Sequence, residues 1–180
     1  MHKDTLDLDT AESVINVADK GTIEDINVKL TIYHTWDADL NVTLISPIGT
    51  EIGLFSDVGS SGDNFTETIL DDEADMNITA GSAPFTDRYR PEESLSGLDG
   101  EEMQGNWKLR VYDDFSGDEG TLGAWSIEIK YVSPPIWTLW WFLPLVIGVI
   151  IVVAIVIIIA VMRRKPASPT IPPPPPPPPS

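Results

Sequence analysis

Carboxylate side chains gather in short, glycine-containing stretches of this sequence, and these are its clearest candidates for chemistry. Asp113, Asp114 and Asp118 surround a turn that contains Gly117 and Gly120. Hard cations such as Ca²⁺ take six to eight oxygen ligands, so these aspartates form a candidate calcium site. The spacing is not that of an EF-hand, because the sixth position counted from Asp114 is not glycine. The alternative is a solvated turn in which aspartate side chains bond the backbone.

Two further carboxylate clusters have the same two interpretations, a calcium site or a solvated turn. They comprise Asp71, Asp72, Glu73 and Asp75 in one cluster, and Asp37 with Asp39 in the other. Ca²⁺ is the only cofactor that the sequence suggests, and the loop from Asp113 to Asp118 is the first choice for its site.

Nucleophilic catalysis has no recognisable set of residues here. A subtilase triad needs a serine, a histidine base and an aspartate that orients the histidine. The two histidines are His2, next to the N-terminus, and His34, at the end of an alternating run, and no serine stands in a Gly-x-Ser-x-Gly elbow. Cysteine is absent, which excludes disulfides, zinc–thiolate sites and cysteine nucleophiles. The chain by itself is expected not to be an enzyme.

Three Asn-x-Thr triplets match the glycan acceptor pattern and begin at Asn41, Asn64 and Asn77. Such triplets also arise by chance in strands rich in Asn and Thr, so they are candidates for glycosylation only.

The C-terminus holds eight consecutive prolines, Pro172 to Pro179. Such a run adopts the polyproline II helix, which rises about 3.1 Å per residue. This pre-ordered helix can dock into the aromatic grooves of profilin, SH3 or WW modules, with Pro172, Pro175 and Pro178 as candidate contacts. The alternative is a stiff low-complexity end that has no partner.

The charge is unevenly distributed along the chain. All 28 Asp and Glu residues precede Pro134, together with only eight Lys and Arg residues. Because phosphate binding needs Lys and Arg to displace counterions, such an acidic surface argues against nucleic acid as a partner.

An apolar run without a charged residue extends from Ile136 to Met162. It exceeds the roughly 20 residues that a helix needs to cross a bilayer, and it predicts a single transmembrane helix. Trp137, Trp140 and Trp141 lie near the start of the run, and Arg163, Arg164 and Lys165 directly follow its end. Positive charge stays on the cytoplasmic side, so we expect a single-pass cell-membrane protein with an extracellular N-terminal domain and a cytoplasmic C-terminus.

The first nine residues include no apolar stretch of about seven or more residues, as a secretory signal would. We therefore expect the sequence to be the C-terminal part of a longer protein. The alternative is that the terminal helix alone directs its N-terminal domain across the membrane.

Apolar and polar residues alternate repeatedly before residue 133, and this period of two is typical of half-buried strands. The segments are 26–32, 40–44, 107–111 and 125–131, with shorter candidates at 14–17, 52–55 and 65–69. Without a long amphipathic helix among them, seven or eight short strands predict an all-β, antiparallel jelly-roll-type sandwich. Residues 82–104 are expected to form a long surface connection that packs onto the sandwich.

Five ordered blocks stand at compatible spacing between Val14 and Val132. The blocks are His34-Thr35 with Asp39-Leu40 and Ser46–Thr50; Asn64–Thr66 with Asp71–Ala74; Ala83–Thr86 with Tyr89–Glu92 and Leu95; Gly105–Leu109 with Asp113; and Gly117-Asp118 with Gly120–Leu122 and Trp125. Together they resemble the P domain, also called Homo B, of kexin- and furin-like subtilases. Asp87 stands where that family's loop typically has glycine.

This resemblance implies a β-sandwich that packs against a subtilisin-like serine protease domain, in the same chain or another, and stabilises it. It also implies a structural role for His34 and an influence of the domain on the protease's response to pH and calcium. The alternative function is a free-standing extracellular binding module linked to the cytoplasm by its polyproline tail. The expected organisation is an extension (1–12), the sandwich (13–133), the membrane helix (136–162) and the tail (163–180).

Overall fold

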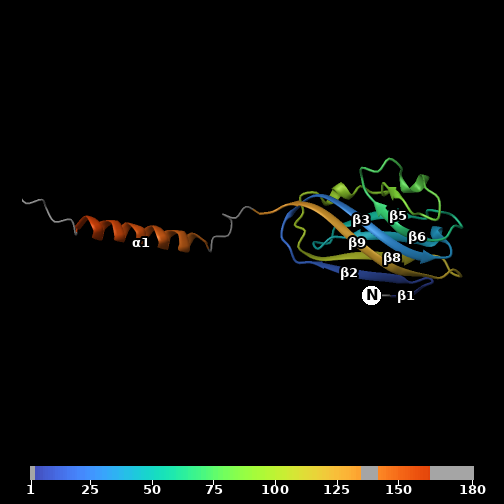
Figure 1. The fold of residues 1–180 in the computed structure, drawn as a ribbon. Coiled ribbons are helices and arrows are strands. Elements are labelled where there is room, and N and C mark those ends of the chain that lie inside the picture. The colour runs from blue at the N-terminus through green and yellow to red at the C-terminus, as the bar shows by residue number, and fades with distance from the viewer. Residues whose placement is uncertain (1–2, 135–141, 163–180) are drawn as a thin grey trace, which may run out of the picture. The chain divides into compact units, whose positions relative to one another are not determined.

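A computed structural model of the chain describes residues 3–134 and 142–162. The chain divides into two compact units, residues 1–134 and 135–180. The first unit is a sandwich of two β-sheets, as expected (Figure 1).

One sheet has five strands in the order β1-β9-β3-β6-β7, and the other has four in the order β2-β8-β4-β5. The strands are β1 (Lys3–Leu6), β2 (Thr10–Val17), β3 (Thr22–His34), β4 (Leu40–Ile45), β5 (Glu51–Ser56), β6 (Phe65–Leu70), β7 (Arg88–Tyr89), β8 (Gly105–Asp113) and β9 (Gly120–Val132).

All seven segments in which strands were predicted lie in strands of the structure, and β1 and β7 are additional. β1 and the first residues of β2 fall within the stretch expected to be an N-terminal extension. The pairs of neighbouring strands are antiparallel, except that β6 and β7 are parallel, which the expected antiparallel sandwich did not include.

The core lies between the two sheets and is built by the alternating residues. In β3, the side chains of Ile26, Val28, Leu30 and Ile32 are at most 1% exposed, and Trp107 of β8 is fully buried. Three phenylalanines connect the layers, because Phe55 of β5 stacks on Phe65 of β6 at 4.6 Å, and Phe65 stacks on Phe85 at 4.7 Å.

The connection between β6 and β8 packs onto the sandwich as predicted for residues 82–104. It holds the short 3₁₀ helices η2 (Ile78–Ala80) and η3 (Leu95–Leu98) and strand β7. Phe85, Leu95 and Leu98 are at most 1% exposed, so this connection supplies part of the core.

The second unit contains the helix α1 (Phe142–Met162), which has no charged residue. The transmembrane helix predicted over 136–162 is not confirmed, since none of the helices within the described residues meets the criteria of length and hydropathy for a membrane span. Residues 136–141 and the whole tail from 163 lie outside the described residues.

Candidate functional site

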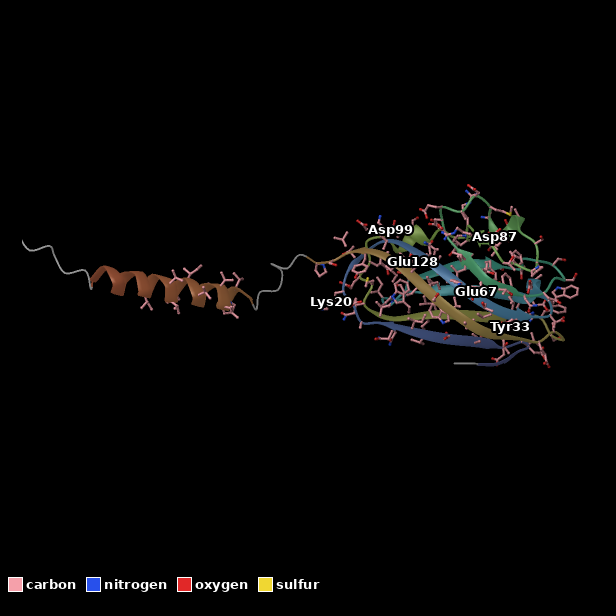
Figure 2. The ribbon with its side chains drawn as sticks, viewed as in Figure 1. Lys20, Tyr33, Glu67, Asp87, Asp99 and Glu128 are labelled. Carbon is pink, nitrogen blue, oxygen red and sulfur yellow. The ribbon has the colours of Figure 1, made fainter. Side chains whose placement is uncertain are left out.

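The strand register brings four distant segments together at one end of the sandwich. His34, the last residue of β3, pairs with Gly120, the first residue of β9, and Leu40 pairs with Asp113, the last residue of β8. The short helix η1 (Asp37–Asp39) connects β3 to β4 at this end. Figure 2 labels Tyr33, which directly precedes His34.

The imidazole of His34 and the carboxylate of Asp113 form a fully buried pair. The Nε2–H of His34 donates to Oδ2 of Asp113 at 3.1 Å, and Oδ1 of Asp113 accepts from the backbone N–H of Phe115 at 3.1 Å. The other ring nitrogen, Nδ1, lies 2.8 Å from the carbonyl oxygen of Trp36. The contact between His34 and Asp113 joins the ends of β3 and β8, and the other two fix the start of the segment that follows each strand. This is the structural role that the family resemblance implied for His34.

Asp37 is buried close to this pair. Its Oδ1 accepts from the backbone N–H of Asn64 at 2.8 Å, while its Oδ2 has no hydrogen-bond partner among the described residues. Burial raises the pKa of Asp37 to about 7, against the lowering effects of the Asn64 N–H and of His34, and Asp63 raises it a little further. Asp37 therefore changes charge near neutral pH.

Asp39 at the end of η1 is also buried, and its pKa is raised first by desolvation and then by the negative charges of Asp113, Asp118 and Asp114. His34 lowers it in part. This end of the sandwich therefore has a carboxylate in a strongly negative environment.

The three aspartates predicted to bind calcium have separate partners in the structure. Asp113 faces His34, Asp114 accepts from Nδ2 of Asn41 at 2.9 Å, and Asp118 accepts from Oγ1 of Thr35 at 2.9 Å. Within the part of the chain that the structure describes, no group of three or more Asp, Glu or His side chains is placed to hold a metal ion. As placed, these carboxylates do not converge as a shell of six to eight oxygens requires. Calcium binding stays a prediction.

The second carboxylate cluster contains aspartates that bond the backbone, which was the alternative to calcium. Asp71 accepts from the N–H of Glu73 at 2.7 Å and forms an ion pair with Arg88. Asp72 accepts from the backbone N–H groups of Leu95 at 3.0 Å and Ser96 at 2.8 Å. These aspartates tie the turn after β6 to β7 and η3.

The three candidate glycosylation sites are half-buried, and the side-chain amide of each takes part in hydrogen bonds. Asn41 donates to Asp114, Asn64 accepts from the N–H of His34 at 3.1 Å, and Asn77 caps η2 by accepting from the N–H of Thr79 at 2.9 Å. Glycosylation stays a prediction. The candidate contacts Pro172, Pro175 and Pro178 lie outside the described residues.

Sequence reasoning missed Trp36 and Phe115, which stand at the same end of the sandwich and are 42% and 65% exposed. With Asp39 and Asp118 they line a cavity of about 280 Å³. The available signal was that each aromatic residue is adjacent to one aspartate and has a second within three positions, in a segment that connects strands.

Comparison with known proteins finds a family and individual proteins to which this chain is similar. The family model described as proprotein convertase P-domain matches residues 23–129. Leupeptin-inactivating enzyme 1 of Streptomyces exfoliatus is 30% identical over 118 residues, which cover 66% of this chain and 20% of that protein. A serine protease of Aeromonas sobria, solved in complex with a chaperone, is similar with a TM-score of 0.50 and 21% identity, covering 72% of this chain and 25% of that one.

The chain thus spans between a fifth and a quarter of the length of these two relatives. The matched region begins in β3 and ends in β9, and it includes His34, the short helices η1, η2 and η3, and the acidic end of the sandwich. The match covers more than half of the chain and confirms the resemblance seen in the five sequence blocks. The chain belongs to the proprotein convertase P-domain family, a non-catalytic accessory domain of subtilisin-like proteases.

Proposed function

We propose that this chain stabilises and positions the catalytic domain of a subtilisin-like serine endopeptidase, carried in the same polypeptide or on another chain. The observation that carries the proposal is the family match over residues 23–129, which coincides with the core of the sandwich. The buried His34–Asp113 pair is in keeping with this role, because it joins the ends of β3 and β8 and is closed to substrate.

A fluorophosphonate probe, which labels active serine hydrolases covalently, tests this proposal. A tag is added to this sequence within its native gene, the product is crosslinked and purified from the native cell, and the probe is then added. We expect a labelled subtilisin-like protease, either as a larger form of the tagged polypeptide or as a crosslinked partner. Removal of residues 13–133 should lower the melting temperature of that protease, whereas removal of residues 166–180 serves as the control and should not. Recovery of the chain with no labelled hydrolase in any form would contradict the proposal.

The second part of the proposal is a membrane anchor formed by residues 136–162, with the sandwich outside the cell. It is supported by the absence of charge over that run and by Arg163, Arg164 and Lys165 directly after it. The chain should resist extraction from membranes by alkaline carbonate. An N-terminal tag should be removed by protease added to intact cells, while a C-terminal tag should be protected. Release by carbonate would count against the anchor.

The third part is a cytoplasmic partner for the polyproline run. A peptide of residues 166–180 should bind a profilin, SH3 or WW module, because a preformed polyproline II helix loses little entropy on docking. The matched control peptide replaces Pro172, Pro175 and Pro178 by alanine and should bind less tightly. Equal binding of both peptides, or binding of neither, would favour a low-complexity end without a partner.

The second candidate function is a free-standing extracellular binding module. It is supported by the compact unit of residues 1–134, whose two sheets share one continuous core. Under this alternative, residues 1–134 expressed alone form a monomer that unfolds cooperatively, and the native chain carries no subtilase. Dependence of the isolated unit on a protease domain for folding would reject it.

A further inference from the structure

The cavity lined by Trp36, Asp39, Phe115 and Asp118 has an unusual composition, two aromatic and two acidic residues. Trp36 directly precedes η1, and Asp39 is the last residue of that helix. Phe115 and Asp118 belong to the loop that connects β8 to β9. Two aromatic and two acidic residues, from two separate segments, therefore line the same space of about 280 Å³.

Asp39 is the residue that points to a ligand. Only 6% of its surface is exposed, and its Oδ2 has no hydrogen-bond partner among the described residues. A buried carboxylate without a partner is costly, because burial removes the hydration that stabilises its charge. Because this oxygen is itself closed to solvent, a donor that enters the cavity gains this bond only when the Asp39 carboxylate turns toward it.

The ligand must be a cation, because the surroundings of Asp39 are negative. Asp113, Asp114 and Asp118 all act on Asp39 to disfavour its charged form, and His34 alone opposes them. His34 is already bonded to Asp113. In contrast, Asp118 is half-buried, and the hydrogen bond from Thr35 involves only its Oδ1. Its second oxygen is available to a donor in the cavity.

The aromatic rings favour an organic cation over a metal ion. Calcium takes six to eight oxygens, whereas much of this cavity is hydrocarbon ring from Trp36 and Phe115. A guanidinium group stacks on aromatic faces, is weakly hydrated, and donates two parallel hydrogen bonds to a carboxylate. The volume lies just below the range of about 300–1,000 Å³ for sites that hold whole small-molecule ligands, so a single side chain suits it better.

We propose that this cavity binds an arginine side chain presented by a partner protein. The guanidinium stacks against Trp36 and Phe115 and donates to the carboxylates of Asp39 and Asp118. A peptide-borne arginine suits the site better than the free amino acid, because the α-carboxylate of free arginine would be repelled by the acidic loops. The proposal holds for either candidate function and does not depend on which protein carries the arginine.

Nuclear magnetic resonance of the purified full chain tests this proposal, with the Trp36 indole N–H and the Asp118 amide as reporters. The probe is the peptide Gly-Gly-Arg-Gly-Gly with blocked ends, and its matched control carries citrulline, which has the same shape but no charge. We expect the reporter resonances to shift and saturate with the arginine peptide. Free arginine should bind more weakly, and the citrulline peptide should cause no shift.

Three variants locate the site. Phe115→Ala and Asp118→Asn should each weaken binding at least about fivefold, as expected for the loss of a cation–π contact or a charged hydrogen bond. Asp99→Asn removes one exposed charge outside the cavity and should change affinity less than about twofold. Phe115 is 65% exposed, so its removal should leave the fold intact.

Three outcomes would overturn the proposal. These are equal shifts with the citrulline peptide, equal effects of Asp118→Asn and Asp99→Asn, and no effect of Phe115→Ala. A parallel titration with CaCl₂ separates the metal alternative. Saturation of the same resonances by calcium, without displacement by the arginine peptide, would assign the site to the metal ion instead.

Discussion

Nε2 of His34 lies 3.1 Å from Oδ2 of Asp113, and both side chains are fully buried at the end of the sandwich where β3 and β8 stop. The two residues are 79 positions apart in the sequence. Since Asp113 also accepts from the N–H of Phe115, both of its carboxylate oxygens are used inside the protein.

Replacement of Asp113 by asparagine tests this pair. An amide has one acceptor oxygen, so it cannot accept from both His34 and the N–H of Phe115 as the carboxylate does, and it removes the negative charge beside the imidazole. We expect the free energy of unfolding to fall by about 2–3 kcal/mol in urea denaturation. The control is Asp114→Asn, one residue further on and exposed, which should change it by less than about 0.5 kcal/mol. An equal loss of unfolding free energy in the two variants would show that the His34–Asp113 pair stabilises the fold no more than the exposed Asp114 does.

Asp37 predicts a pH dependence of stability. Its folded-state pKa is about 7, above the ordinary value of 3.8, so between these values the folded state binds more protons than the unfolded state. The stability that this proton contributes is fully present below about pH 4 and is lost as the pH rises through about 7.

The variant Asp37→Asn keeps an acceptor for the Asn64 N–H but carries no charge. The difference in unfolding free energy between variant and wild type should therefore increase in favour of the variant from pH 5 to pH 8. Asp99→Asn, at an exposed position, should follow the wild type at every pH. A difference that does not change with pH would contradict the buried, proton-binding state of Asp37.

Gly120 predicts a steric limit beside His34. A Cβ at this position would lie 2.1 Å from Cδ2 of the buried imidazole and 2.6 Å from the backbone oxygen of Tyr33. Gly120→Ala should destabilise the sandwich by about 1–3 kcal/mol in urea denaturation, because the ring has no room to move. Gly97→Ala is the matched control, since its Cβ meets only the flexible end of Ile52 at 3.1 Å. A Gly120→Ala variant as stable as Gly97→Ala would contradict this packing.

The phenylalanine stack predicts where the core is most sensitive. Phe65 is fully buried between Phe55 and Phe85, so Phe65→Ala should cost about 3–5 kcal/mol of unfolding free energy. Ile48 is 70% exposed, and Ile48→Ala should cost less than about 0.5 kcal/mol. Thermal unfolding followed by circular dichroism compares the two. A small effect at Phe65 would mean that the two sheets are not joined by this stack.

Most of the strands could be predicted from the sequence because alternation is a property of neighbouring residues. Ile26 to Ile32 and Trp107 to Val111 alternate in sequence, and the same residues alternate between core and surface in the structure. β1 and β7 could not be predicted, since they have four and two residues and exist only through pairing with distant strands.

The candidate site shows more clearly what could not be predicted from the sequence. The sequence indicated the loop from Asp113 to Asp118 as an acidic site, but it could not distinguish the roles of the individual aspartates. Asp113 is the last residue of β8 and is buried against His34, whereas Asp114 begins the loop that follows and is exposed.

The five ordered blocks of the sequence indicated the family by resemblance, and the carboxylate clusters indicated acidic loops. Only the tertiary structure decided that Asp113 is paired with His34, that Oδ2 of Asp39 lacks a hydrogen-bond partner among the described residues, and that Trp36 and Phe115 line a cavity with Asp39. These facts depend on contacts between segments far apart in the chain.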